Sequence, residues 1–186
     1  MKASSKHVAL LRGINVGGKN MLPMKELAAM FVKAGCGDVT TYIQSGNVVF
    51  SAEDKVVAGL GGGIAKRVEE RFGIRVPVVL RTAAEIDAAI RGNPFLEAGA
   101  SEEMLHVCFL ADRPGKDLVA GLDAGRSSPD AFAVAGREIY MQLVNGAAKT
   151  KLTNAYFDSK LKTVSTMRNW RTVLKLAEMM RQGCAR

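Results

Sequence analysis

The chain has 186 residues, of which 48% are hydrophobic and 6% aromatic, and its formal net charge is +8. The length corresponds to one domain or two small ones, and the apolar content excludes a disordered or collagen-like chain. No apolar run approaches the roughly 18 residues that span a bilayer and the N-terminus is polar, so we expect neither a membrane-embedded nor a secreted protein.

The first half of the chain predicts strand, helix, two strands, helix, strand and helix. The ranges are a strand at 7–12, a helix from Pro23 to Gly35, strands at 39–44 and 47–51, a helix from Asp54 to Gly73, a strand at 76–80 and a helix from Thr82 to Ile90. Ser45-Gly46 indicates a tight hairpin, and Thr82 with Glu85 forms a capping box. Each glycine of the run 61–63 costs a helix about 1 kcal/mol relative to Ala, so we expect a kink or break there.

The second half begins the same order again, because 105–110 (LHVCFL) echoes 6–11 (KHVALL). The ranges are a strand at 105–110, a helix at 118–122, strands at 131–135 and 138–142, and helices at 154–161 and 170–180. No strand is visible between the last two helices. The second copy is therefore predicted to end in a helix without its final strand.

The order β-α-β-β-α-β is the split βαβ arrangement of ferredoxin-like domains. We therefore predict an α+β fold of tandem ferredoxin-like (βαββαβ) units with antiparallel sheets, the second unit ending in a C-terminal helix. The predicted domains are residues 1–95, the first ferredoxin-like unit, and residues 96–186, the second unit with the C-terminal helix.

Charge and cysteine content add expectations about partners and compartment. Residues 1–50 and 137–186 are basic, whereas 51–136 are mildly acidic. This asymmetry favours an anionic partner, although a basic protein that is merely soluble explains it equally well. Cys36, Cys108 and Cys184 are far apart and form no C-x-x-C pair. They indicate reduced thiols in the cytoplasm rather than a zinc site or a disulfide framework.

The loop at 12–20 (RGINVGGKN) lies between a strand and a helix, where glycines let backbone N–H groups approach a phosphate. It nearly matches a P-loop, but Asn20 replaces the Ser or Thr that coordinates Mg²⁺, and the next connection is a hairpin. The sequence therefore argues against an ATPase. It leaves open a Gly-rich turn against the sheet or an anion site. The candidate ligands in this loop are Arg12, Asn15, Lys19 and Asn20.

The hairpin at 44–47 supplies Gln44, Ser45 and Asn47 as further candidates. A tight turn by itself explains Gly46 and Asn47, whereas it does not require Gln44 or Ser45. In a ferredoxin-like sheet the loop after the first strand can lie at the end opposite to this hairpin. We therefore expect that the two loops need not share a site.

The third candidate group is 166–170 (TMRNW), predicted at the start of the last helix, with Thr166 or Asn169 as N-cap. Arg168 beside exposed N–H groups would attract an anion, so Arg168 and Asn169 are candidate ligands. Trp170, the only tryptophan, fits a core anchor better than a base-stacking platform. The basic stretch at 149–162 suits single-stranded nucleic acid, but a solvated helix face explains it as well.

No catalytic constellation is recognisable. His7 and His106 start the two matching strands without a ligand-spaced partner, and G-x-S-x-G and H-E-x-x-H are missing from the sequence. Catalytic residues stay unknown, and we expect no metal and no cofactor. The polar candidates are rich in Arg, Lys, Asn, Gln and Ser, a set that binds anions better than it moves protons.

Long blocks of the sequence resemble the bacterial domain-of-unknown-function 1697 family. The blocks are LLRGINVGGKN (10–20), LPM (22–24), YIQSGNVVF (42–50), NPF (93–95), HVCFL (106–110), TMRNWRTV (166–173) and KL (175–176). The resemblance implies a cytoplasmic bacterial protein with duplicated ferredoxin-like units. It supplies no catalytic residue, substrate or cofactor. The glycine run at 61–63 departs from the family pattern.

The leading hypothesis is a binding module for a phosphorylated ligand, nucleotide or nucleic acid. Arg12, Lys19 and Arg168 would supply charge; Asn15, Asn20, Gln44, Ser45, Asn47 and Asn169 would supply amide and hydroxyl contacts, with Trp170 beside them. The alternatives are a transferase-like enzyme acting on a small anionic substrate by electrostatics, and a protein-interaction module. The expected partners are an anionic small molecule or nucleic acid and no membrane, and the oligomeric state stays open.

Overall fold

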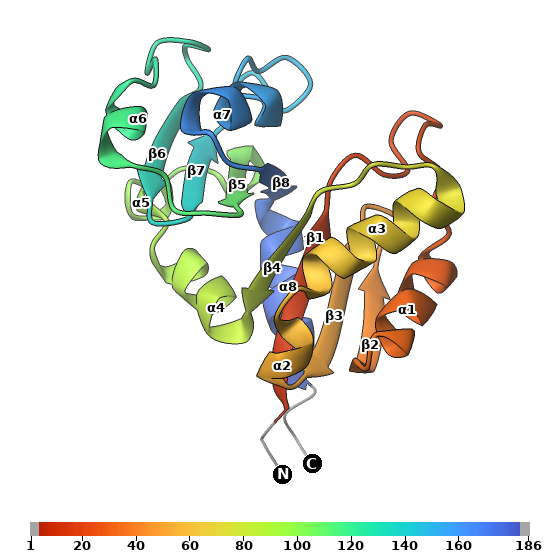
Figure 1. Ribbon diagram of the computed structural model, residues 1–186. Helices are drawn as coiled ribbons and strands as arrows, with labels where there is room; N and C mark the ends of the chain where they lie inside the picture. Colours follow the sequence, from red (N-terminus) through yellow and green to blue (C-terminus); the bar gives the residue numbers. More distant parts are fainter. Residues whose placement is uncertain (1–3, 183–186) are drawn as a thin grey trace. The chain divides into compact units, whose positions relative to one another are not determined.

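A computed structural model describes residues 4–182 and places Cys184 outside the described range. The first half of the chain contains β1 (Ser5–Leu11), α1 (Met24–Lys33), β2 (Gly37–Tyr42), β3 (Asn47–Ala52), α2 (Asp54–Val57), α3 (Leu60–Phe72), β4 (Val78–Thr82), α4 (Ala83–Arg91) and α5 (Pro94–Glu97) (Figure 1). The second half contains a 3₁₀ turn (Glu102–Met104), β5 (Leu105–Leu110), α6 (Lys116–Ala120), β6 (Ala131–Ala135), β7 (Glu138–Gln142), α7 (Asn154–Leu161), β8 (Ser165–Asn169) and α8 (Trp170–Gln182).

The strands form two four-stranded antiparallel sheets with the same order, β2-β3-β1-β4 and β6-β7-β5-β8. Corresponding residues also take corresponding places, since Val8 pairs with Arg81 across β1 and β4 while Val107 pairs with Arg168 across β5 and β8. The predicted α+β fold with two ferredoxin-like units and a C-terminal helix is confirmed. That the two units arose by duplication stays a prediction.

The chain forms two compact units, Met1–Ile86 together with Lys175–Arg186, and Asp87–Leu174. Each sheet lies wholly within one unit. The first unit carries the sheet of β1–β4, and the second unit carries the sheet of β5–β8. The predicted domain ranges, 1–95 and 96–186, stay a prediction, and like the compact units they keep each sheet intact.

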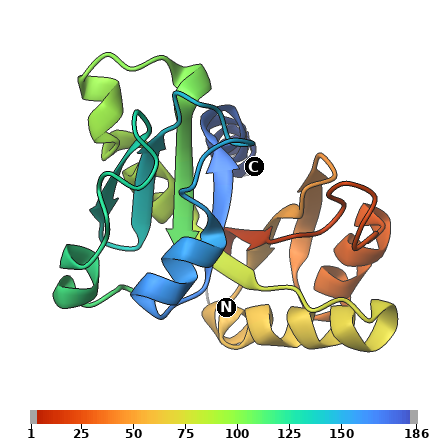
Figure 2. The ribbon, with the colours of Figure 1, turned by 90° about the horizontal axis from the view of Figure 1, so that it is seen from above.

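In the first unit, α1 and α3 pack on one face of the sheet (Figures 1 and 2). Leu27 and Phe31 of α1 and Ile64 of α3 are fully buried in one core with strand residues, and the rings of Phe31 and Phe50 lie 5.2 Å apart. Burying each such side chain stabilises the fold by about 1.5–3 kcal/mol. The amphipathic spacing read from the sequence therefore identifies the faces that pack.

In the second unit, α7 covers the sheet of β5–β8 (Figure 2). Phe157 and Leu161 of α7 are buried with Cys108, Ile139 and Met141 of the strands. Thr153 caps this helix by accepting a hydrogen bond from the Tyr156 N–H at 3.2 Å. A helix of only eight residues is thus held by one cap and by packing.

The final strand of the second unit exists, contrary to the prediction. Ser165, Thr166 and Arg168 of β8 are buried although they are polar, so hydrophobic alternation cannot reveal the strand. β8 also passes directly into α8, which makes its last residues look like a helix start. Asn169 does cap α8, since its Oδ1 accepts from the Thr172 N–H at 2.8 Å.

The helix between β3 and β4 breaks before the glycine run rather than within it. The break falls at Ala58 and Gly59, and Gly59 has a φ of +81°. Gly61 lies inside α3, where an added Cβ would stand 3.3 Å from the carbonyl oxygen of Val78. A close approach of α3 to β4 therefore explains the missing side chain at Gly61.

The Thr82–Glu85 capping box is confirmed at the start of α4. The Thr82 N–H donates to Glu85 Oε2 at 2.8 Å, and the Glu85 N–H donates to Thr82 Oγ1 at 3.2 Å. Asn93 caps α5 in the same manner, with Oδ1 accepting from the Phe95 N–H at 3.1 Å. The capping box is thus read correctly from sequence, whereas α5 is not among the predicted helices.

His7 and His106, the two histidines of the chain, begin β1 and β5 with Nδ1 near a backbone carbonyl, at 3.1 Å from Ser5 O and 3.3 Å from Met104 O. Burial lowers the pKa of both imidazoles.

Below a pH of about 6.5 the two imidazoles therefore bind protons more readily in the unfolded chain than in the folded one. The free energy of unfolding is expected to fall as the pH falls. We expect the urea midpoint to drop from pH 7.5 to 5.5, and to drop less in the His7→Gln/His106→Gln variant. Equal drops of the urea midpoint in the two proteins would contradict the role of His7 and His106 in this pH dependence.

Candidate functional site

Three loop segments meet at one end of the first sheet, at residues 12–23, 43–46 and 73–77; we call this region the loop end (Figure 1). The Leu11 N–H donates to Gly46 O at 2.8 Å, and the Arg12 N–H donates to Pro77 O at 3.1 Å. The Gly-rich loop and the hairpin thus lie at the same end of the sheet, whereas the sequence analysis allowed for opposite ends. Because β1 and β3 are antiparallel neighbours, the end of β1 lies beside the start of β3.

The side chain of Asn15 ties two of these segments together. Its Nδ2 donates to Gln44 O at 2.8 Å and to Leu22 O at 2.9 Å, while its Oδ1 accepts from the Leu22 N–H at 2.8 Å. The φ of Asn15 is +53°, a conformation that Asn tolerates better than most residues. Asn15 therefore serves first to hold the Gly-rich loop against the hairpin.

The other predicted amide ligands are also engaged within the loop end. Asn20 Nδ2 donates to Gly13 O at 2.7 Å, and the fully buried Asn47 donates to Tyr42 O at 3.2 Å and to Ser45 Oγ at 2.9 Å. These bonds shape the loops. The amide groups of Asn15, Asn20 and Asn47 are occupied by the protein itself.

Gly46 is the closest packing point between the loops. Its φ is +75°, and an added Cβ would stand 2.7 Å from Leu11 Cβ and 3.0 Å from Ile14 Cδ1. Only glycine satisfies both the backbone conformation and the space. The sequence explains Gly46 by the needs of a tight turn. The structure adds a second reason, the packing against Leu11 and Ile14, which the sequence does not reveal.

The charge of the loop end is entirely positive. Its three segments carry Arg12, Lys19 and Arg75 and no Asp or Glu, and Lys25 and Glu26 follow in the first turn of α1. Arg75 pairs with Glu69 at 2.7 Å. Lys19 and Lys25 are exposed and have no acidic partner within residues 4–182. The predicted cations Arg12 and Lys19 therefore lie at one surface.

Three large apolar side chains are also exposed at the loop end: Val16 (65% exposed), Met21 (64%) and Ile43 (53%). Each is adjacent in sequence to a residue that hydrogen-bonds with Asn15 or to Asn15 itself. Ile43 has a φ of +47°, which is a strained conformation for a β-branched residue. Strained conformations of this kind cluster at functional sites.

Arg168 does not lie beside free helix N–H groups, as predicted, but within β8. Its Nη1 donates to Thr166 Oγ1 and to Met167 O, both at 2.8 Å, and burial lowers its pKa to about 10. The guanidinium thus donates to two acceptors of its own strand. It satisfies buried acceptors and is not presented on the surface.

The neighbours of Arg168 differ in accessibility. Asn169 is exposed, with its Oδ1 used to cap α8. Trp170 is buried at 1% exposure, which bears out a core position and leaves no face free for stacking on a base. Arg168, Asn169 and Trp170 belong to the second unit, whereas the other predicted ligands belong to the first.

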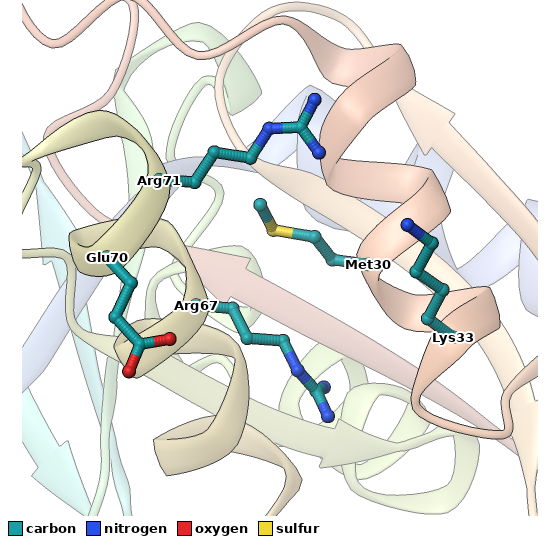
Figure 3. Close-up of a pocket in the computed structure, with 5 residues that line it drawn as sticks. All are labelled: Met30, Lys33, Arg67, Glu70 and Arg71. Carbon is teal, nitrogen blue, oxygen red and sulfur yellow. The ribbon is translucent and has the colours of Figure 1, made fainter.

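Sequence reasoning missed a pocket of about 270 Å³ between α1 and α3, lined by Met30, Lys33, Arg67, Glu70 and Arg71 (Figure 3). Its cations come from the last turn of α1 and the second half of α3. These segments are far apart in sequence and carry no motif. The recurrence of Arg67 and Arg71 four residues apart is the one available signal, and it is typical of any solvated helix face.

Residues 4–182 contain neither a candidate metal site nor a membrane-spanning helix. No group of three or more His, Cys, Asp or Glu side chains there could hold a metal ion. None of the helices in this range is long and apolar enough to cross a membrane. The chemistry available at the loop end is therefore that of cations, amides, backbone groups and exposed aliphatic side chains.

Comparisons with known proteins agree with this architecture. The chain is similar to a solved structure, the conserved bacterial protein SP0830 from Streptococcus pneumoniae, with 24% identity and a TM-score of 0.70 over 96% of this chain and 99% of that one. At this identity the likeness concerns the fold alone. A comparison with curated proteins gave no match. A family model described as protein of unknown function (DUF1697) matches residues 4–140, and with most of its length covered the chain belongs to that family.

Proposed function

We propose that the protein is a binding module for nucleic acid, which it contacts through phosphates at the loop end of the first unit. The observation that carries this proposal is the absence of Asp and Glu from the three segments of the loop end, beside the exposed cations Lys19 and Lys25. A surface of one sign attracts the phosphate backbone, which supplies most of the affinity in non-specific binding.

The rigidity of the loop end supports the same proposal. Asn15, Asn20 and Asn47 fix the loops from within, so the cations stand on a formed surface before a partner arrives. A preformed surface loses less conformational entropy on binding. The glycines of the loop, among them Gly17 and Gly18 with positive φ, leave backbone groups open to close approach.

The test is a titration of a fluorescein-labelled oligothymidine of about twelve nucleotides, a length that fits common single-strand site sizes, followed by anisotropy. We expect saturable binding that weakens steeply between about 50 and 200 mM salt. Lys19→Ala should weaken binding several-fold and reduce the slope of log K against log salt by about 0.7, the value for one lost phosphate contact on a single strand.

Lys66→Ala is the matched control, because it removes the same charge from α3 outside the loop end, where Lys66 lies 3.7 Å from Glu70. It should leave the salt slope unchanged. Absence of saturable binding at the lower salt, or equal effects of Lys19→Ala and Lys66→Ala, would refute phosphate contacts at the loop end.

A second candidate, a protein-interaction module, is favoured by the exposed Val16, Met21 and Ile43. Aliphatic side chains contribute to protein interfaces, whereas stacking on bases requires aromatic or guanidinium planes. The same titration separates the two candidates. Ile43→Ser should leave the affinity for the oligonucleotide nearly unchanged if phosphate contacts dominate binding. If the oligonucleotide does not bind at all, the protein-interaction module becomes the leading candidate.

A further inference from the structure

We propose that the pocket between α1 and α3 is a separate site for a small phosphate monoester, held by Lys33 and Arg67, with Arg71 beside them. This inference does not rest on the proposed function, because Lys19 and the rest of the loop end do not line the pocket. The pocket belongs wholly to the first unit.

The two helices place three cationic side chains around one apolar floor. Figure 3 shows Lys33 extending from α1 and Arg67 and Arg71 extending from α3 around Met30. Met30 is buried at 5% exposure, so its thioether closes the bottom of the pocket while the cationic groups surround its opening. An apolar floor with a few convergent polar groups is the usual construction of a small-molecule site.

The pocket carries an excess of positive charge that the chain does not neutralise. Arg71 Nη2 pairs with Glu26 at 2.7 Å, and Glu70, the acidic residue that lines the pocket, lies 3.7 Å from Lys66. Lys33 and Arg67 have no acidic partner anywhere in residues 4–182. Two cations thus remain for a ligand.

A phosphate monoester matches this excess in charge and in geometry. Near pH 7 it carries a charge of about −1.5 to −2, and its three oxygens accept the planar fork of Arg together with the point charge of Lys. The volume of about 270 Å³ lies just below the range of typical ligand pockets, which favours a small phosphorylated molecule over a dinucleotide.

The experiment is calorimetric titration of the full chain with ribose 5-phosphate, with inorganic pyrophosphate as a second phosphate probe and ribose as the matched ligand without phosphate. We expect ribose 5-phosphate and pyrophosphate to bind and ribose not to bind. Arg67→Ala and Lys33→Ala should each weaken phosphate binding about tenfold, the effect of losing one charge-assisted hydrogen bond.

Lys55→Ala, which removes an exposed positive charge outside the pocket, should leave the affinity unchanged, as should Lys19→Ala at the loop end. Lys33 and Arg67 are exposed, so their substitution spares the fold, which thermal unfolding of each variant checks. The proposal is overturned if neither phosphate probe binds at up to about 10 mM, a concentration that detects even millimolar affinity, or if Lys55→Ala weakens binding as much as Arg67→Ala.

Discussion

Replacing Gly46 by Ala is expected to destabilise the first unit by about 2–5 kcal/mol, combining the cost of a left-handed backbone with that of overpacking. The added Cβ would stand 2.7 Å from Leu11 Cβ, an atom close to the backbone of β1 that cannot move aside. Urea unfolding followed by far-UV circular dichroism measures the loss as a lowered transition midpoint.

Gly13→Ala is the matched control for this substitution. Gly13 has the same φ of +75°, but an added Cβ there would meet nothing within 4 Å. Gly13→Ala therefore costs only the free energy of placing Ala in a left-handed backbone conformation, about 1–2 kcal/mol. A Gly46→Ala variant no less stable than Gly13→Ala would show that the loops do not pack at Gly46 as described.

Replacing Asn15 by Ala is expected to cost about 4 kcal/mol, because three side-chain hydrogen bonds of about 1 kcal/mol each are lost and Ala adopts the positive φ less readily. Two of the bonds hold Leu22 before α1, and the third holds Gln44 in the hairpin. The variant should also exchange the amide protons of the Gly-rich loop faster, a direct measure of loosened loops.

Asn20→Ala is the control for this comparison, because it has the same backbone cost of placing Ala at a positive φ but loses one hydrogen bond instead of three. Its φ of +51° is close to that of Asn15, yet its side chain makes a single bond to Gly13 O. We expect a loss of about 2 kcal/mol. If both variants lose the same stability, the bonds of Asn15 to Leu22 and Gln44 contribute nothing, and its assignment as the residue that joins the loops is wrong.

The regular elements of the fold follow from local patterns, because helices and hairpins are encoded by residues close in sequence. The hairpins at Gly46 and Gly136 and the capping box at Thr82 are each fixed within a few residues. β8 escapes the same reading because its buried residues are polar. They include Arg168, whose donors are used within the strand, so burial there depends on pairing with β5 rather than on hydrophobicity.

The candidate site, too, could be predicted from sequence only where a local pattern marks it. Sequence draws attention to Arg12, Lys19 and the hairpin, since charge and turn residues are visible without coordinates, and their role as ligands stays a prediction. It assigns ligand roles to Asn15 and Asn47, because an amide that braces a loop and an amide that contacts a ligand look alike in sequence. The α1–α3 pocket requires the packing of two helices separated by two strands, which no local pattern reports.

The two sheets share a strand order but not their first connection. After β1 the chain runs through residues 12–23 before α1, whereas after β5 it needs only residues 111–115 before α6. The shorter connection demonstrates that this architecture closes without a Gly-rich loop. The longer connection is thus not required by the strand order itself; what it adds is Ile14 and Leu22, both buried in the core of the first unit, and the loops that Asn15 joins.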